Sequence, residues 1–87
     1  SVALTSEQLA AFVGTYSSAQ LGMDLKITSD GTRLQGQATG QPAFPLTATS
    51  ETDFEFKPAG IVIKFDVSSK KLTLNQGGGK FDFVKKE

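Results

Sequence analysis

Few residues of this chain have the types and spacing that acid, base or nucleophilic chemistry requires. Ser68-Ser69-Lys70-Lys71 matches the S-x-x-K pattern, in which a serine attacks an acyl carbon and a lysine helps to remove its proton. That chemistry needs the serine at the start of a helix, with the lysine one turn later. Here the four residues separate two segments of alternating apolar and polar residues, and neither S-D-N nor K-T-G occurs in the chain. The pattern therefore favours a turn between two strands.

The glycine triplet 77–79 followed by Lys80 has some likeness to a phosphate-binding loop. A Walker motif would need glycine at the position of Leu74 and a helix after the lysine. An alternating apolar segment follows instead, so we expect a hairpin turn in which glycine supplies positive φ angles.

Carboxylates offer the remaining chemistry, because the chain contains no His and no Cys. Asp53 and Glu55 lie two residues apart and could serve as an acid and a base or hold a calcium ion. More often such residues form a solvated outer face with cross-strand ion pairs, here with Lys57 or Lys64. Without His and Cys, the commonest general base, zinc ligand and thiol nucleophile are all missing. We therefore expect no enzyme activity, no catalytic residue, no metal site and no cofactor.

A short helix is expected over about residues 6–13. Thr5 and Gln8 form a capping box, in which each side chain bonds the backbone N–H of the other residue. Gly14 is placed to end the helix in a left-handed conformation. The apolar positions at staple and helical spacing are Leu4, Leu9, Phe12 and Val13. Two turns are marginal by themselves, so this apolar face must dock on another element.

From residue 14 onward, apolar and polar residues alternate with a period of two, between turns rich in Gly, Pro, Ser, Asp and Asn. The pattern predicts eight strands. Pro45 indicates an edge, a bulge or a strand start. The expected inward residues are Met23, Leu25, Ile27, Leu34, Gly36, Ala38, Phe44, Leu46, Ala48, Phe54, Phe56, Ile61, Ile63, Phe65, Val67, Leu72, Leu74, Phe81 and Phe83.

Eight short strands joined by tight turns leave no room for crossover helices, so we expect an antiparallel up-and-down meander. Closure into a barrel would remove its exposed edges. The small inward residues Gly36 and Ala38, set against several inward Phe residues, suit a barrel filled by side chains. The fold class is therefore all-β, a small closed barrel with a short N-terminal helix.

Two polar residues share the inward phase of this pattern. Gln76 follows Leu72 and Leu74 in phase and points inward at a barrel end, and Tyr16 is expected to face in with its hydroxyl at a rim. Together they could line a small ligand mouth. The alternative is that inward polar groups near strand ends only meet water or a backbone carbonyl.

Composition narrows the class of partner. Eighty-seven residues make one domain, spanning residues 1–87, which we expect to be excised from a larger protein. No apolar run approaches the roughly 20 residues that span a bilayer, so membrane insertion is not expected. Nine basic residues balance nine acidic ones, which leaves no surplus charge for a nucleic acid backbone.

The segment L-A-A-F-V-G-T-Y at residues 9–16 resembles the opening of a family of small lipocalin-like β-barrel domains, with its helix followed by an (F/Y)-V-G-x-Y step. These domains of unknown function are found at the C-terminal end of serine β-lactamase-like hydrolases and related exported bacterial enzymes. The similarity continues through residues 34–42, 44–46, 49–54, 63–65 and 72–78. One departure is the turn at residues 68–71, which replaces the family's more usual Asp/Asn-Gly hairpin.

The resemblance implies a non-catalytic accessory domain that shapes substrate access or holds domains and subunits together. The expected partner is the neighbouring hydrolase domain of the parent chain, and self-association is the second possibility. The resemblance also implies a periplasmic or extracellular location. The alternative is a lipocalin-like barrel that acts alone and binds a small ligand. Seven Phe argue against a roomy interior, and a cavity well below about 300 Å³ would count against that alternative.

Overall fold

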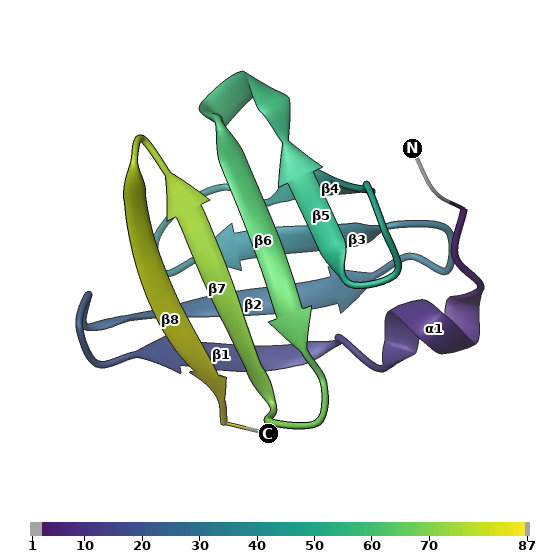
Figure 1. Ribbon diagram of the computed structural model, residues 1–87, viewed down its shortest axis with the longest axis horizontal. Coiled ribbons are helices and arrows are strands. Elements are labelled where there is room, and N and C mark those ends of the chain that lie inside the picture. Colours follow the sequence, from purple (N-terminus) through teal and green to yellow (C-terminus); the bar gives the residue numbers. More distant parts are fainter. Residues whose placement is uncertain (1–2, 87) are drawn as a thin grey trace.

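Each alternating segment of the sequence forms a strand in the computed structural model of the protein, which describes residues 3–86. Each strand pairs antiparallel with the next, and β8 pairs with β1, so the sheet closes into an up-and-down barrel (Figure 1). The predicted fold class is confirmed. The elements are α1 (Ser6–Ala10), β1 (Gly14–Ser18), β2 (Met23–Ser29), β3 (Leu34–Ala38), β4 (Phe44–Ala48), β5 (Asp53–Phe56), the 3₁₀ turn η1 (Lys57–Ala59), β6 (Ile61–Asp66), β7 (Lys71–Gln76) and β8 (Gly79–Lys85).

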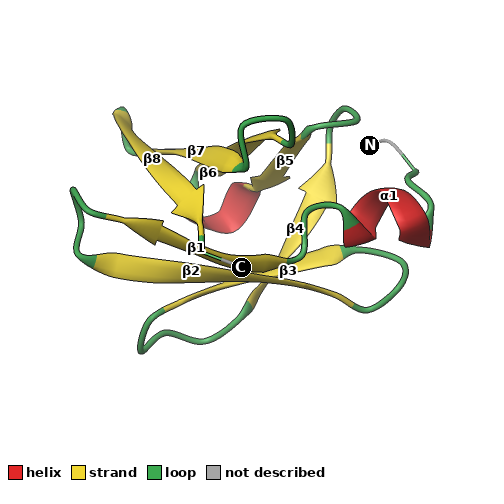
Figure 2. Cartoon of the chain, turned by 90° about the horizontal axis from the view of Figure 1, so that it is seen from below, coloured by secondary structure: helices red, strands yellow, loops and turns green. Residues whose placement is uncertain are grey.

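The barrel is flattened into two layers that cross at a steep angle. Strands β1, β2 and β3 form one layer, and β5 to β8 form the other (Figures 1 and 2). Within the layers the ladders are long, with five residue pairs between β1 and β2 and six between β6 and β7. At the two corners, β4 with β5 and β8 with β1, only two pairs are made. The layers are therefore held together at short corners and can diverge beyond them.

Pro45 lies at the β4–β5 corner, in the part of β4 that does not pair with β5. It pairs with Gln35 of β3, whereas β5 pairs only with Thr47 and Ala48 of β4. On its β5 side Pro45 is thus a local edge, a position where the missing N–H costs no ladder bond. The sequence-based expectation of an edge is confirmed in this local sense.

The helix begins as predicted and ends early. The Gln8 N–H donates to Thr5 Oγ1 at 3.1 Å and the Thr5 N–H donates to Gln8 Oε1 at 2.9 Å, which completes the capping box. The helix ends at Ala10, with Ala11 as a right-handed cap, so the expected end at Gly14 is wrong. The N–H groups of Phe12 and Val13 bond three residues back rather than four. Because these bonds form a tighter turn than an α-helix, the helix ends before Gly14, and the Phe12 side chain is buried in the barrel.

Four rings close the barrel at the helix end, and we call Phe12, Tyr16, Phe54 and Phe65 the aromatic plug. The centroid of Phe12 lies 4.5 Å from that of Phe65 and 5.5 Å from that of Phe54, and Tyr16 packs edge-on against Phe65. All four residues are buried. The Tyr16 hydroxyl donates to the backbone oxygen of Phe12 at 2.9 Å and so ties the helix exit to β1.

Among the described residues, no helix is long and apolar enough to cross a membrane.

The turn from β6 to β7 corrects one inward assignment. Val67 was expected to continue the inward face of β6, but the strand ends at Asp66 and Val67 is 49% exposed in the turn. In the same turn Lys70 adopts a φ of 56°, the one positive value at a residue other than glycine among those described. A lysine in this left-handed conformation strains the backbone.

Removal of the Tyr16 hydroxyl tests its role as a tie. Tyr16→Phe keeps the ring contacts but leaves the buried Phe12 oxygen without its donor. We expect the free energy of unfolding at neutral pH to fall by about 1–2 kcal/mol, measured by urea denaturation. An unchanged stability would show that the Phe12 oxygen finds another donor.

Alkaline pH should act on the same group. Burial raises the pKa of Tyr16 above its ordinary value of 10.0. The folded state therefore favours the neutral phenol, and this contribution is present below pH 10 and is lost as pH rises through the folded pKa. We expect the native protein to lose stability relative to Tyr16→Phe above pH 10. Phenolate absorbance reports the titration directly, because Tyr16 is the single Tyr and the chain has no Trp.

Relief of strain at Lys70 should stabilise the hairpin. Lys70→Gly removes the penalty of the left-handed conformation, which exceeds the entropic cost of glycine, so we expect a gain of up to about 1 kcal/mol in thermal or urea unfolding. Lys71→Gly is the matched control, because Lys71 opens strand β7 and glycine there should lower stability by about 0.5–1 kcal/mol. Equal effects of the two substitutions would contradict strain at position 70.

Candidate functional site

The S-x-x-K residues join β6 to β7, as expected: Ser68, Ser69 and Lys70 lie in the turn, and Lys71 opens β7. The Ser68 hydroxyl donates to Asp66 Oδ1 at 2.9 Å, and the Ser69 N–H donates to the same oxygen at 3.2 Å. These bonds hold the pKa of the exposed Asp66 carboxyl below its ordinary value. Ser68 is thus a turn residue beside a carboxylate, without a lysine one helical turn away.

The glycine triplet also forms a turn. Gly77 and Gly78 have φ values of 58° and 82°, and Gln76 pairs with Gly79 across a two-residue loop. Positive φ at both central positions is the geometry of the tight hairpin that suits the sheet twist. A strand follows, so the hairpin prediction is confirmed and there is no helix N-terminus to receive a phosphate.

Asp53 and Glu55 each interact with a residue close by in the sequence. Glu55 makes an ion pair with Lys57 at 3.7 Å, and Asp53 accepts a hydrogen bond from Thr52 at 3.2 Å. Between residues 3 and 86, no group of three or more His, Cys, Asp or Glu side chains lies close enough to hold a metal ion. Pairing of Glu55 with its neighbour is typical of a solvated outer face.

The feature that suits binding is an apolar cavity of about 230 Å³ at the end of the barrel opposite the plug. We call this opening the mouth. Its lining includes residues of the β1–β2 and β7–β8 hairpins, which diverge from each other (Figure 2). Its lining residues are Leu21, Met23, Leu25, Ala38, Phe44, Ile61, Leu74, Gln76, Phe81 and Phe83. Apart from Gln76, every lining side chain is apolar, and none is titratable.

Several large apolar side chains around the mouth are not fully buried. Leu21 at the rim is 39% exposed, whereas Leu9 in the helix above the plug is 1% exposed. Met23, Phe44, Leu74 and Phe81 are only partly buried. Exposure of large apolar side chains around a hollow is typical of a binding surface.

Phe44, which lines the mouth, stacks on Phe56, which lies outside the lining. The ring centroids of Phe44 and Phe56 lie 5.1 Å apart, nearly parallel. Phe44 lies across Gly36, where a Cβ atom would approach the ring to 2.9 Å. Because Gly36 has no side chain, it leaves the space that the Phe44 ring fills, and the small inward residue predicted there is required for this packing.

The structure separates the two residues that the sequence placed at one mouth. Gln76 lines the mouth, and its Nε2 donates to the backbone oxygen of Ala59 at 3.2 Å. Tyr16 lies in the plug at the far end, with its hydroxyl bonded to a backbone carbonyl. Contact of either residue with a ligand stays a prediction. The sequence does not reveal the apolar ring around Gln76 as a site, because its pattern assigns every member except Leu21 to the core.

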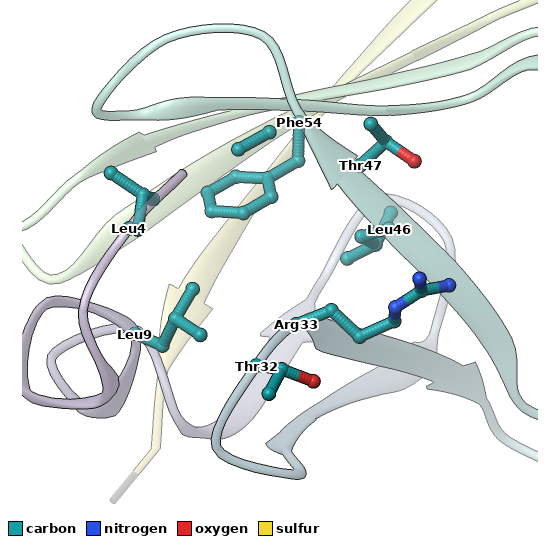
Figure 3. A pocket seen from close by; sticks show the side chains of 8 residues that line it. Leu4, Leu9, Thr32, Arg33, Leu46, Thr47 and Phe54 are labelled. Carbon is teal, nitrogen blue, oxygen red and sulfur yellow. The ribbon is translucent and has the colours of Figure 1, made fainter. Parts of the chain in front are cut away.

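A second, smaller hollow of about 130 Å³ lies beside the helix (Figure 3). Leu4, Leu9 and Phe54 form its apolar part, and the side chain of Arg33 extends past Leu46 at its other side. Three hydrogen bonds from residues 32 and 33 hold the pKa of neighbouring Asp30 below its ordinary value. The hollow is the gap left between the hydrophobic staple and the sheet.

A further depression of about 320 Å³ lies beside Pro45, Phe56 and Pro58, at the corner where β4 and β5 part. Apart from Phe56, which packs against the core, its residues belong to the outer face, and it is open to solvent. Of these hollows, the mouth has an almost wholly apolar lining and is partly enclosed between the two layers. We therefore take it as the candidate binding site.

Comparisons of the chain with protein-family models, with curated proteins and with solved structures give no match. The fold itself, a small eight-stranded antiparallel up-and-down barrel, is consistent with a lipocalin-like barrel.

Proposed function

We propose that this chain is a non-catalytic binding module that holds a small apolar group in the mouth of its barrel. The observation that carries the proposal is the partly exposed apolar ring around the mouth cavity, with Gln76 as its one polar member. An occupant would cover Leu21, Met23 and Phe81, whose burial the fold leaves incomplete.

The cavity volume limits the size of the occupant. Its 230 Å³ is below the roughly 300 Å³ at which pockets for drug-sized ligands begin. An apolar cavity of about 150 Å³ is enough to hold benzene. The proposed occupant is therefore one aromatic ring or a short branched alkyl group, and a long lipid chain or a haem is too large.

The lining defines how such a group would bind. Dispersion contacts and release of water would provide the affinity, with Gln76 able to orient a polar atom at the rim. For a ligand of so few atoms we expect a Kd between about 10 µM and 1 mM.

Beside a larger hydrolase, the same mouth would receive an apolar side chain of the neighbouring domain or an apolar part of its substrate. This is the form that we propose for the accessory role implied by the resemblance. The coding sequence upstream of Ser1 tests it, since a serine hydrolase with S-x-x-K on a helix is expected there. Ester or β-lactam hydrolysis by the chain itself, abolished by Ser68→Ala, would contradict a non-catalytic role.

Binding at the mouth can be tested with toluene as the probe. We expect saturable NMR shifts at Met23, Leu74 and Phe81, and none at Phe12 in the plug. Ala38→Leu adds three carbons to the lining and should weaken toluene binding at least tenfold, about 1.4 kcal/mol. Ala10→Leu, on the exposed face of α1, adds the same atoms far from the mouth and should leave binding unchanged.

A second variant covers the case in which Ala38→Leu does not fold. Leu74→Ala enlarges the cavity and should admit naphthalene, which the native mouth is too small to enclose. Equal toluene affinity in native protein and folded Ala38→Leu, or shifts centred on the plug, would overturn the proposal.

A further inference from the structure

Strand β8 carries an edge that the barrel does not pair. On one side all six residues of β7 pair with it, from Gln76 opposite Gly79 to Lys71 opposite Val84. On the other side β1 pairs only with Val84 and Lys85. In both views the first half of β8 stands clear of the β1–β2 hairpin (Figures 1 and 2).

The early end of β1 causes this gap. Continued register between β1 and β8 would bring Ala19 opposite Asp82, because Ser17 is opposite Val84. Residues 19–22 instead form the β1–β2 turn, closed by the Gly22 N–H on the Ser18 oxygen at 2.8 Å. The edge of β8 from Gly79 to Asp82 therefore faces solvent.

The unpaired backbone groups can be assigned from the register. In an antiparallel ladder, alternate residues direct their N–H and C=O groups to opposite sides. The two-residue hairpin makes Gln76 and Gly79 a hydrogen-bonded pair, so Phe81 and Phe83 also bond β7. Lys80 and Asp82 therefore direct both backbone groups to the open edge.

The side chains of these two residues carry opposite charges on the outer face. Lys80 and Asp82 are exposed, and neither makes an ion pair within residues 3–86. Asp82 Oδ1 accepts one hydrogen bond, from Thr73 Oγ1 at 3.0 Å. Such an edge is complementary to a strand that carries an acid opposite Lys80 and a base opposite Asp82.

We propose that this edge pairs with the same edge of a second copy of the chain. Antiparallel pairing about a two-fold axis at Phe81 sets Lys80 opposite Asp82 of the second copy, and Asp82 opposite Lys80 of the second copy. Both pairs join residues whose backbone groups face the edge, so each exchanges two hydrogen bonds. The same register that completes the backbone bonds also matches the charges.

Two-fold symmetry makes this contact self-limiting. An open edge is a template for continued strand addition, which leads to aggregation. In the proposed pair each β8 edge meets its equivalent, so the contact closes at a dimer and leaves neither β8 edge open.

The dimer can be tested by sedimentation of the full chain between about 10 µM and about 1 mM, the range in which a contact of four backbone bonds is populated. We expect the mean mass to rise towards twice that of the monomer. Amide exchange of Lys80 and Asp82 should slow severalfold over the same range. The amides of Phe81 and Phe83, which bond β7 in the monomer, should not change.

Charge reversal provides the matched controls. Lys80→Asp and Asp82→Lys each set like charges opposite one another and should raise the dimer Kd at least tenfold. The double variant, Lys80→Asp with Asp82→Lys, restores opposite charges and should restore the dimer. A monomer at all concentrations would overturn the proposal, and so would a dimer that the single reversals leave unchanged.

Discussion

The aromatic plug is the contact on which the rest of the barrel depends. Phe12 reaches it from the helix exit, Tyr16 from β1, and Phe54 and Phe65 from the opposite layer, so one cluster joins α1 to both sheets. A helix of five residues has no independent stability, and its position comes from Leu9 and Phe12 packing on this cluster. The rings fill most of the helix end and leave a hollow of about 130 Å³ there, whereas the cavity at the other end has about 230 Å³.

The mouth cavity and the open β8 edge have a common origin in the short corners. β1 ends at Ser18 while β8 extends back to Gly79, so the two strands share only two residue pairs. β4 and β5 likewise share two. Past these pairs the layers diverge, which leaves apolar side chains unburied between them and backbone groups unpaired along β8. A longer β1 would remove both features at once.

Alternation predicted which residues face inward but not how far each lies along the barrel axis. Tyr16 and Gln76 are in the same inward phase, yet one lies in the plug and the other at the mouth. That depth depends on the pairing of β8 with β1, a contact between residues about 70 positions apart that no local pattern encodes. Local signals were accurate where the interaction is local, as in the Thr5–Gln8 capping box and the glycine hairpin. They failed at element ends, where alternation runs past the strand at Val67 and helical spacing runs past Ala10.

The binding role that we propose rests on the lining of the mouth as a set rather than on the exposure of single apolar side chains. Exposed apolar residues occur at both ends, with Val13 37% exposed at the helix exit and Leu21 39% exposed at the mouth. At the mouth, however, Leu21 and the partly buried Met23, Leu74 and Phe81 line one apolar cavity. A chain of 87 residues has little core to spare, and a second short helix would have closed the mouth as α1 closes the plug end. The polar side chains at Asp30, Asp66 and Ser68 bond their own turns, so the recognition that we propose uses the apolar mouth and the open edge of β8 instead.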